Sequence, residues 1–126
     1  MIWLISGGRK FASPVFVHNN LDRVAEERGL PELVVVGGAA GVDTVAQNWA
    51  QLNNIPVAIH KAEWEEHGRA AGHIRNSEML EAHDIDLGLF FPSGLSKKSS
   101  PGTYDMLQKT RTAGIEAVVF NAESYI

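Results

Sequence analysis

Short apolar runs alternate with longer amphipathic segments along the chain. The runs are rich in branched and aromatic residues, and they are continuous rather than interrupted by a regular polar face. Continuous runs of this length are typical of strands that are buried on both faces, as in a parallel sheet. The pattern therefore predicts five strands, at residues 2–5, 33–36, 57–59, 85–91 and 117–120.

The segment between the first two runs carries clear helix boundaries. Ser13 suits the N-cap, Pro14 suits the first helical position, and Gly29 suits the left-handed position that follows the last turn. In the next segment, Asp43 is the candidate cap of a second helix. Both segments repeat apolar residues at helical spacing, which predicts one buried face on each helix.

Weaker helical patterns cover residues 75–82 and 103–113, so that strands and helices alternate along the whole chain. This alternation predicts an α/β fold with right-handed crossovers, in the form of a three-layer sandwich around a parallel five-stranded sheet. We expect residues 1–126 to form a single domain. Ligands of such sheets bind beyond the carboxyl ends of the strands, which directs attention to the loops that follow them.

Composition narrows the range of functions. The chain has 126 residues, 44% of them hydrophobic, and a formal net charge of -4, which argues against a broad basic surface for nucleic acid or an anionic membrane. It contains no cysteine, which excludes disulfides, thiolate metal sites and a cysteine nucleophile. The first residues lack the basic region of a signal peptide, and no apolar run approaches the roughly 20 residues of a membrane span. We therefore expect a cytoplasmic protein with no membrane contact.

The first predicted strand is followed by the sequence SGGRKF at residues 6–11. Gly7 and Gly8 allow the backbone to come close to a ligand, and Arg9 and Lys10 bring two cations to the same edge. These residues predict a phosphate site. A tight turn with solvated basic side chains explains them equally well.

The second strand is followed by the sequence GGAAGVD, which runs directly into a helix. Gly37, Gly38 and Gly41 would leave backbone N–H groups at the positive end of the helix dipole, an arrangement that suits an anion. Asp43 is interpreted either as the N-cap or as a ligand of a ribose hydroxyl. The glycine pattern is neither a dinucleotide fingerprint at the first turn nor a Walker loop.

The polar segment at residues 60–79 follows the third strand. Trp64 is a candidate stacking surface for a base, although the same ring would also suit the sheet edge. Arg69, Arg75 and Asn76 are candidate polar contacts. Arg75 is expected to open a helix, where a cation opposes the helix dipole, and this cost is easier to explain if Arg75 faces an anion.

The same segment raises the question of a zinc site. His60, His67 and His73 could supply ligands, but their spacings match no compact pair of ligands on a helix. The sequence therefore leads us to expect no metal and no cofactor.

The fourth strand runs into FFPSGLSKKSSPGTYD at residues 90–105, whose end offers backbone N–H groups and a hydroxyl at the start of the last long helix. Lys97 and Lys98 add positive charge between the two ends of this segment. The candidate ligand contacts are Pro92, Ser93, Gly94, Gly102 and Thr103. Two helix N-termini and several cations are thus expected at one edge, which favours a phosphorylated, nucleotide-like ligand.

Taken together, SGGRKF, GGAAGVDTVAQNWA, EWEEHGRAAGHIRNSEML and the split PSG…GTYDM resemble the YspA-like, cpYpsA-related branch of the SLOG superfamily. This Rossmann-like group also contains, more distantly, the Lonely Guy phosphoribohydrolases. The resemblance covers nearly the whole chain, and HGRAAGHIRNSEML is its most specific part. It implies a Rossmann-like sandwich domain that binds nucleotides or nucleotide-derived molecules.

Enzymatic members of the superfamily cleave the N-glycosidic bond of nucleoside 5′-monophosphates with a PGG-x-GT-x-x-E loop and an arginine on the preceding helix. Arg75 aligns with that arginine, and Pro92, Gly94, Gly102 and Thr103 align with the loop. The resemblance implies that these residues surround the ligand.

The chain departs from the enzymatic pattern at two places. Ser93 replaces a glycine, and residues 95–101 stand where the enzymes have one residue. Met106 occupies the position of the glutamate, and Asp105 lies one residue earlier, about 100° away around a helix. Glycosidic cleavage needs a carboxylate at a defined place beside an oxocarbenium-like transition state. Binding is therefore favoured over catalysis, and Arg75 and Asp105 would be the principal residues only of an enzyme.

We expect a protein that senses or sequesters a nucleotide or an ADP-ribose-like molecule, because SLOG proteins associated with antiviral signalling recognise such ligands. A role in antiviral signalling or in phage counter-defence would fit this activity. The alternative is an N-glycosidase or phosphoribohydrolase acting on nucleoside 5′-monophosphates. Single-stranded DNA binding is a third hypothesis, disfavoured by the acidic composition. The resemblance also implies a homo-oligomer, since related domains commonly pair through helices.

Overall fold

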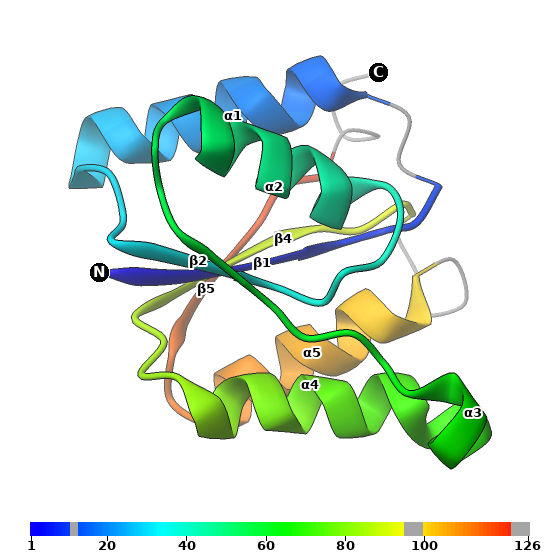
Figure 1. Cartoon of the computed structure of the whole chain (residues 1–126). Helices are drawn as coiled ribbons and strands as arrows, with labels where there is room; N and C mark the ends of the chain where they lie inside the picture. Colours follow the sequence, from blue (N-terminus) through cyan, green and yellow to red (C-terminus); the bar gives the residue numbers. More distant parts are fainter. Residues whose placement is uncertain (11–12, 95–99, 122–126) are drawn as a thin grey trace.

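The strands form one parallel sheet in the order β3, β2, β1, β4, β5, with β1 at its centre (Figure 1). The structure is a computed structural model, and it describes residues 1–10, 13–94 and 100–121. The strands are β1 (Ile2–Gly7), β2 (Leu33–Val36), β3 (Val57–Ile59), β4 (Leu87–Phe91) and β5 (Glu116–Val119). The predicted five-stranded parallel sheet is confirmed, with its fourth strand beginning at Leu87 rather than at residue 85.

Helices cover both faces of the sheet, which confirms the predicted three-layer, Rossmann-like sandwich. In Figure 1, α1 and α2 lie on one face, and α4 and α5 lie on the other, with α3 beside the start of α4. The helices are α1 (Pro14–Arg28), α2 (Val42–Leu52), α3 (Trp64–His67), α4 (Ala71–Ala82) and α5 (Pro101–Thr112), and a short 3-10 turn, η1 (Gly68–Ala70), joins α3 to α4. None of the helices in the described ranges combines the length and apolar character that a bilayer span requires.

The boundaries of α1 follow the sequence prediction. Ser13 is the N-cap, and its Oγ accepts a hydrogen bond from the Phe16 N–H at 3.2 Å. Pro14 is the first helical residue, and Gly29 ends the helix with a φ of 87°. Each of these signals acts within a few residues, which explains why the sequence alone located them.

The predicted starts of two other helices were wrong. Gly41, rather than Asp43, is the N-cap of α2, and its φ of 77° is one that an L side chain rarely adopts. Helix α4 begins at Ala71, so Arg75 lies more than one turn inside the helix instead of opening it. The argument from the helix dipole therefore does not apply to Arg75, and its partners must be found in the tertiary structure.

Buried side chains form one cluster on each face of the sheet, because successive residues of β1 point to opposite sides. Under α1 and α2, the rings of Trp3 and Trp49 stack with centroids 5.7 Å apart, and the Trp49 Nε1 donates a hydrogen bond to Asp22 Oδ1 at 2.8 Å. On the opposite face, Met106 packs in a cluster that includes Leu4. Met106 is 0% exposed, so the position that carries glutamate in the phosphoribohydrolases belongs to the core here.

We predict that Met106→Glu lowers the free energy of unfolding by more than about 3 kcal/mol, because a carboxylate would lose its hydration inside an apolar cluster. The control is Met106→Leu, which keeps side-chain volume and is expected to cost about 1.5 kcal/mol or less. Urea denaturation of the three proteins measures the difference. A small loss in the glutamate variant would contradict the burial of this side chain.

Candidate functional site

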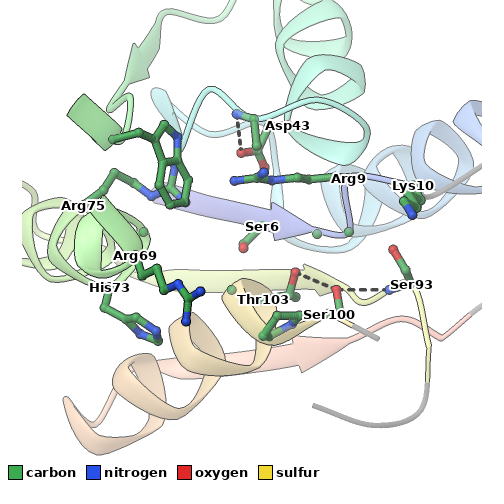
Figure 2. Close-up of a pocket in the computed structure, with 17 residues that line it drawn as sticks. Ser6, Arg9, Lys10, Asp43, Arg69, His73, Arg75, Ser93, Ser100 and Thr103 are labelled. Carbon is green, nitrogen blue, oxygen red and sulfur yellow. Dashed lines mark hydrogen bonds between the residues drawn. The ribbon is translucent and has the colours of Figure 1, made fainter. Parts of the chain in front are cut away.

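A cavity of about 420 Å³ opens at the carboxyl edge of the sheet, where β1 and β4 end and α2 and α5 begin (Figure 2). The strand order reverses at β1, which has β2 on one side and β4 on the other, and parallel sheets bind their ligands at such a point. The residues that line the cavity are Ser6, Gly7, Gly8, Arg9, Lys10, Ala39, Asp43, Trp64, Arg69, Gly72, His73, Arg75, Ser93, Ser100, Pro101, Gly102 and Thr103.

The loop after β1 forms one wall of the cavity and is held between two other elements. The Gly8 N–H donates a hydrogen bond to the Phe91 carbonyl at 3.0 Å, and the Val42 N–H donates one to the Gly8 carbonyl at 3.3 Å. A Cβ on Gly41 would overlap that same carbonyl, and one on Gly7 would overlap the Val42 side chain. Small residues are therefore needed here so that the loop can approach the start of α2.

Asp43 lies near the start of α2 and presents its carboxyl group to the cavity. Its Oδ2 accepts a hydrogen bond from the Ala39 N–H at 3.1 Å, whereas Oδ1 is buried and has no hydrogen-bond partner among the described residues. The residue is 4% exposed. Burial raises the pKa of Asp43 to about 6, although the Ala39 N–H and the positive charge of Arg75 partly oppose the rise. A buried acceptor without a partner is the feature that a hydroxyl group of a ligand would satisfy.

Arg75 connects α4 to the ends of two strands. Its Nη1 donates a hydrogen bond to the Gly37 carbonyl at 2.6 Å and a longer one to the His60 carbonyl at 3.5 Å. Its Nε donates to Asn76 Oδ1 at 3.0 Å. Burial lowers the pKa of Arg75, and the charge of Asp43 opposes this shift. The guanidinium thus has a structural role at the loops after β2 and β3, and it also lines the cavity.

Further positive charge surrounds the opening. The Arg9 guanidinium carbon lies 5.2 Å from the centroid of the Trp64 ring, a cation–π geometry. Trp64 is 47% exposed although it lines the cavity, so a large part of its ring is open to solvent. Two further cations line the cavity: Lys10, in the loop after β1, and Arg69, in η1 (Figure 2). In a chain with a net charge of -4, this concentration of cations creates a local positive field.

The start of α5 forms the opposite wall. Ser100 is its N-cap residue, and its Oγ accepts a hydrogen bond from the Ser93 N–H at 3.4 Å and donates one to Thr103 Oγ1 at 3.1 Å. The Tyr104 hydroxyl donates a hydrogen bond to the Gly94 carbonyl at 2.9 Å. Hydrogen bonds therefore join the loop after β4, at Ser93 and Gly94, to the start of α5, at Ser100 and Tyr104, beside the cavity. The predicted cations Lys97 and Lys98 lie outside the described residues.

Asp105 is not part of the cavity lining. Its Oδ1 lies 2.9 Å from His73 Nδ1, and its Oδ2 accepts hydrogen bonds from Asn76 Nδ2 at 3.0 Å and Lys109 Nζ at 2.8 Å. Burial would raise the pKa of Asp105, but the hydrogen bonds from Lys109, Asn76 and His73 outweigh it and hold the pKa below its ordinary value. Both oxygens of this carboxylate are thus engaged by side chains of α4 and α5.

Comparison with known proteins now settles the family. A sequence model of the YspA, cpYpsA-related SLOG family matches residues 1–67. The chain belongs to this family. It is also similar to the Gene 61 protein of Mycobacterium phage D29, with 34% identity over 122 residues that cover 93% of this chain and 94% of the phage protein. No solved structure matches the chain.

The structure brings together most of the residues predicted for the SLOG ligand site. Those that line the cavity are Gly7, Gly8, Arg9, Lys10, Asp43, Trp64, Arg69, Arg75, Ser93, Gly102 and Thr103. Those that lie outside the lining are Gly37, Gly38, Gly41, Asn76, Pro92, Gly94 and Asp105. Gly37 and Gly41 have packing roles instead, because a Cβ on Gly37 would overlap Arg75 and one on Gly41 would overlap the loop after β1.

The sequence analysis did not identify every residue that lines the cavity as a candidate ligand contact. Ser100 carried a usable signal, because a serine directly before a proline is typical of a helix start. His73 was considered only as a zinc ligand, and its contact with Asp105 had no signal in the sequence because only the tertiary structure brings the two residues together. The remaining missed residues are Ser6, Ala39, Gly72 and Pro101.

The three histidines considered for zinc lie apart in the structure. The Nε2 atom of His60 lies 2.8 Å from that of His83, and the ring of His73 contacts Asp105. Within residues 1–10, 13–94 and 100–121, the one cluster of three potential metal ligands is a different set on and beside α3, with two exposed carboxylates and a half-buried histidine: Glu63, Glu66 and His67. The three histidines considered as zinc ligands are therefore not brought together among the described residues.

We predict that Asp43→Asn stabilises the fold above pH 6. The folded-state pKa of about 6 lies above the unfolded value near 4, so the free energy of unfolding falls as pH rises between these values and is level above them. Asparagine cannot ionise and avoids this loss. We expect the variant to be more stable than the wild type by about 1–3 kcal/mol at pH 7.5, with a smaller difference at pH 4.

Urea denaturation at pH 4, 5.5 and 7.5 measures this effect. The matched control is Asp84→Asn, which removes an exposed carboxylate from outside the cavity. A loss of stability in the Asp43 variant at pH 7.5 would show that the ionised carboxylate is favoured in the folded protein.

Proposed function

We propose that this SLOG protein binds a nucleotide or an ADP-ribose-like molecule derived from one. The single observation that carries the proposal is the cavity between the starts of α2 and α5, which combines several cations with one buried carboxylate oxygen that has no hydrogen-bond partner within the described part of the chain. Cations and helix N-termini suit phosphate, and the unpaired acceptor suits a sugar hydroxyl. Membership of the SLOG family supports the same class of ligand.

Each part of such a ligand has a matching feature in the cavity. The first turn of α5, at Gly102 and Thr103, offers backbone N–H groups to a phosphate. Asp43 Oδ1 can accept a hydrogen bond from a ribose hydroxyl. The exposed part of the Trp64 ring provides a stacking surface for a base.

The biological role that we propose is sensing or sequestration of this ligand. Similarity to a phage protein along nearly the whole chain supports a sequestering role in phage counter-defence, and SLOG membership is compatible with a signalling role. A cytoplasmic location and assembly into a homo-oligomer remain parts of the proposal. Light scattering of the purified protein tests the second of these.

We predict that Arg9→Gln weakens binding of the ligand about tenfold, because the change removes a cation from the cavity and a partner from Trp64. Calorimetric titration with AMP, NAD, ADP-ribose and cyclic ADP-ribose isomers measures the affinity. The matched control is Arg23→Gln, which removes an exposed arginine of α1 and is expected to leave the affinity unchanged.

Three outcomes would contradict this proposal. The first is the absence of binding to any member of the ligand panel at millimolar concentration. The second is an equal loss of affinity in the Arg9 and Arg23 variants, which would indicate a general effect of net charge rather than a site at the cavity. Affinity for a single-stranded oligonucleotide above that for the panel would favour nucleic acid binding instead.

A further inference from the structure

Two histidines outside the cavity lining meet at their ring nitrogens. The Nε2 atom of His60, which follows β3, lies 2.8 Å from the Nε2 atom of His83, which follows α4. The ring centroids are 5.0 Å apart and the ring planes are inclined by 83°, so the rings meet at their edges and do not stack. Imidazole nitrogens are the commonest metal ligands in proteins, and here two of them are in contact.

The backbone holds His60 on the face of the sheet that α4 covers. Its N–H donates a hydrogen bond to the Val36 carbonyl at 2.9 Å, and its own carbonyl accepts the bond of 3.5 Å from Arg75. Ala58, two residues earlier, packs against the buried cluster that contains Met79 of α4. Because side chains alternate between the faces of a strand, His60 continues the face of Ala58.

The end of α4 places His83 opposite this ring. The helix ends at Ala82, and His83 continues the chain with an extended backbone, at a φ of -137° and a ψ of 146°. Met79 before it and Ile85 after it are buried in the same cluster, which anchors the chain on both sides of His83. Each histidine therefore lies in a segment that the core holds, and the fold itself brings the pair together.

The charge state of the pair suits a metal ligand. Both residues are half-buried, so solvent can still reach them. Two imidazolium ions would repel each other at this distance, so at least one ring is neutral. Burial and the neighbouring charge of His60 lower the pKa of His83, which favours the neutral ring there. Neutral imidazole is the form that binds a metal ion.

The distance between the two nitrogens discriminates between metals. Two metal–nitrogen bonds of about 2.0 Å that meet at about 90° place the nitrogens about 2.8 Å apart, whereas a tetrahedral angle places them about 3.3 Å apart. The separation of 2.8 Å between the two Nε2 atoms matches the right angle. Right angles are typical of tetragonal Cu²⁺ and Ni²⁺ sites, whereas Zn²⁺ is usually tetrahedral.

We propose that His60 and His83 form a binding site for Cu²⁺ or Ni²⁺, with the two Nε2 atoms as neighbouring ligands and water at the other positions. In the metal-free pair, one Nε2 carries the hydrogen that joins the rings. When the metal binds, that ring takes the tautomer with its hydrogen on Nδ1, and both Nε2 lone pairs face the ion. The ion would join the loop after β3 to the end of α4.

This site is separate from the cavity, and the proposal does not rest on the proposed function. It departs from the expectation that the chain holds no metal. The sequence analysis grouped His60 with His67 and His73, whereas the structure pairs His60 with His83.

The test is a calorimetric titration of the full chain, without an affinity tag, at pH 7.5 with copper(II), nickel(II) and zinc(II) chlorides. Glycine is added as a weak competing ligand for copper. We expect one ion per chain, with Cu²⁺ bound more tightly than Ni²⁺. His60→Ala and His83→Ala should each weaken binding by more than about tenfold, since each removes a direct ligand. The matched control is His67→Ala, which alters the cluster beside α3 and should leave the affinity unchanged.

Two measurements on the wild type need no variant to fold. Electron paramagnetic resonance of the Cu²⁺ form should show hyperfine coupling to two imidazole nitrogens. Excess Ni²⁺ should raise the midpoint of thermal unfolding, because the two ligands are brought together only in the folded chain. Circular dichroism shows which of the alanine variants retain the fold.

Loss of binding in both variants of the pair, with binding retained in His67→Ala, supports the site. Absence of binding of all three ions to the wild type at millimolar concentration overturns it and leaves the contact as a structural hydrogen bond. Binding that His67→Ala abolishes, or that persists in both His60→Ala and His83→Ala, overturns it because the ion then lies elsewhere. Tighter binding of Zn²⁺ than of Cu²⁺ and Ni²⁺ overturns the assigned class of metal.

Discussion

Close packing of the loop after β1 against the start of α2 is the constraint on which the rest of the site depends. The carbonyl of Gly8 accepts the Val42 N–H, while the N–H of the same residue donates to the carbonyl of Phe91 in β4. One glycine therefore joins the central strand, its neighbour and a helix at a single point. This contact holds the first residue of α2 beside the end of the central strand, and the packing of Trp49 against Trp3 holds the rest of the helix on the sheet. It also fixes where the positive end of that helix points.

The position of α2 also determines which charges meet inside the cavity, namely the carboxyl group of Asp43 and the guanidinium of Arg75. Asp43 is carried into a buried position by α2, and Arg75 reaches towards it from α4 while holding the carbonyl of Gly37. The carboxyl oxygen Oδ2 accepts a hydrogen bond from the Ala39 N–H, and within the described ranges the other oxygen has no hydrogen-bond partner. Such an arrangement costs stability in the free protein and is compensated when a ligand supplies the missing hydrogen bond. Sites that are tuned for recognition commonly have this cost.

Local signals in the sequence predicted much of the fold and part of the site. The continuous apolar runs located the sheet, and Ser13 and Gly29 located the ends of α1 because caps depend on adjacent residues. The start of α4 was misplaced because the segment before Arg75 contains Gly68 and Gly72, which weaken a helical pattern.

Contacts between elements distant in the sequence could not be predicted in this way. The bond between His73 and Asp105 joins two helices that are separated by β4. The same limit explains the misplaced cap of α2. Asp43 is a typical capping residue, but its carboxylate bonds to the preceding loop at Ala39, and the helix begins at a glycine that the packing of another loop requires.

The hydrogen bonds beside the start of α5 have a consequence for how changes in length affect this chain. The Tyr104 hydroxyl holds the carbonyl of Gly94, and Ser100 receives the N–H of Ser93, so both ends of the intervening segment are tied to the body of the domain. The entropy of closing a loop grows only slowly with its length. Residues added or removed between these anchors should therefore leave the cavity walls in place.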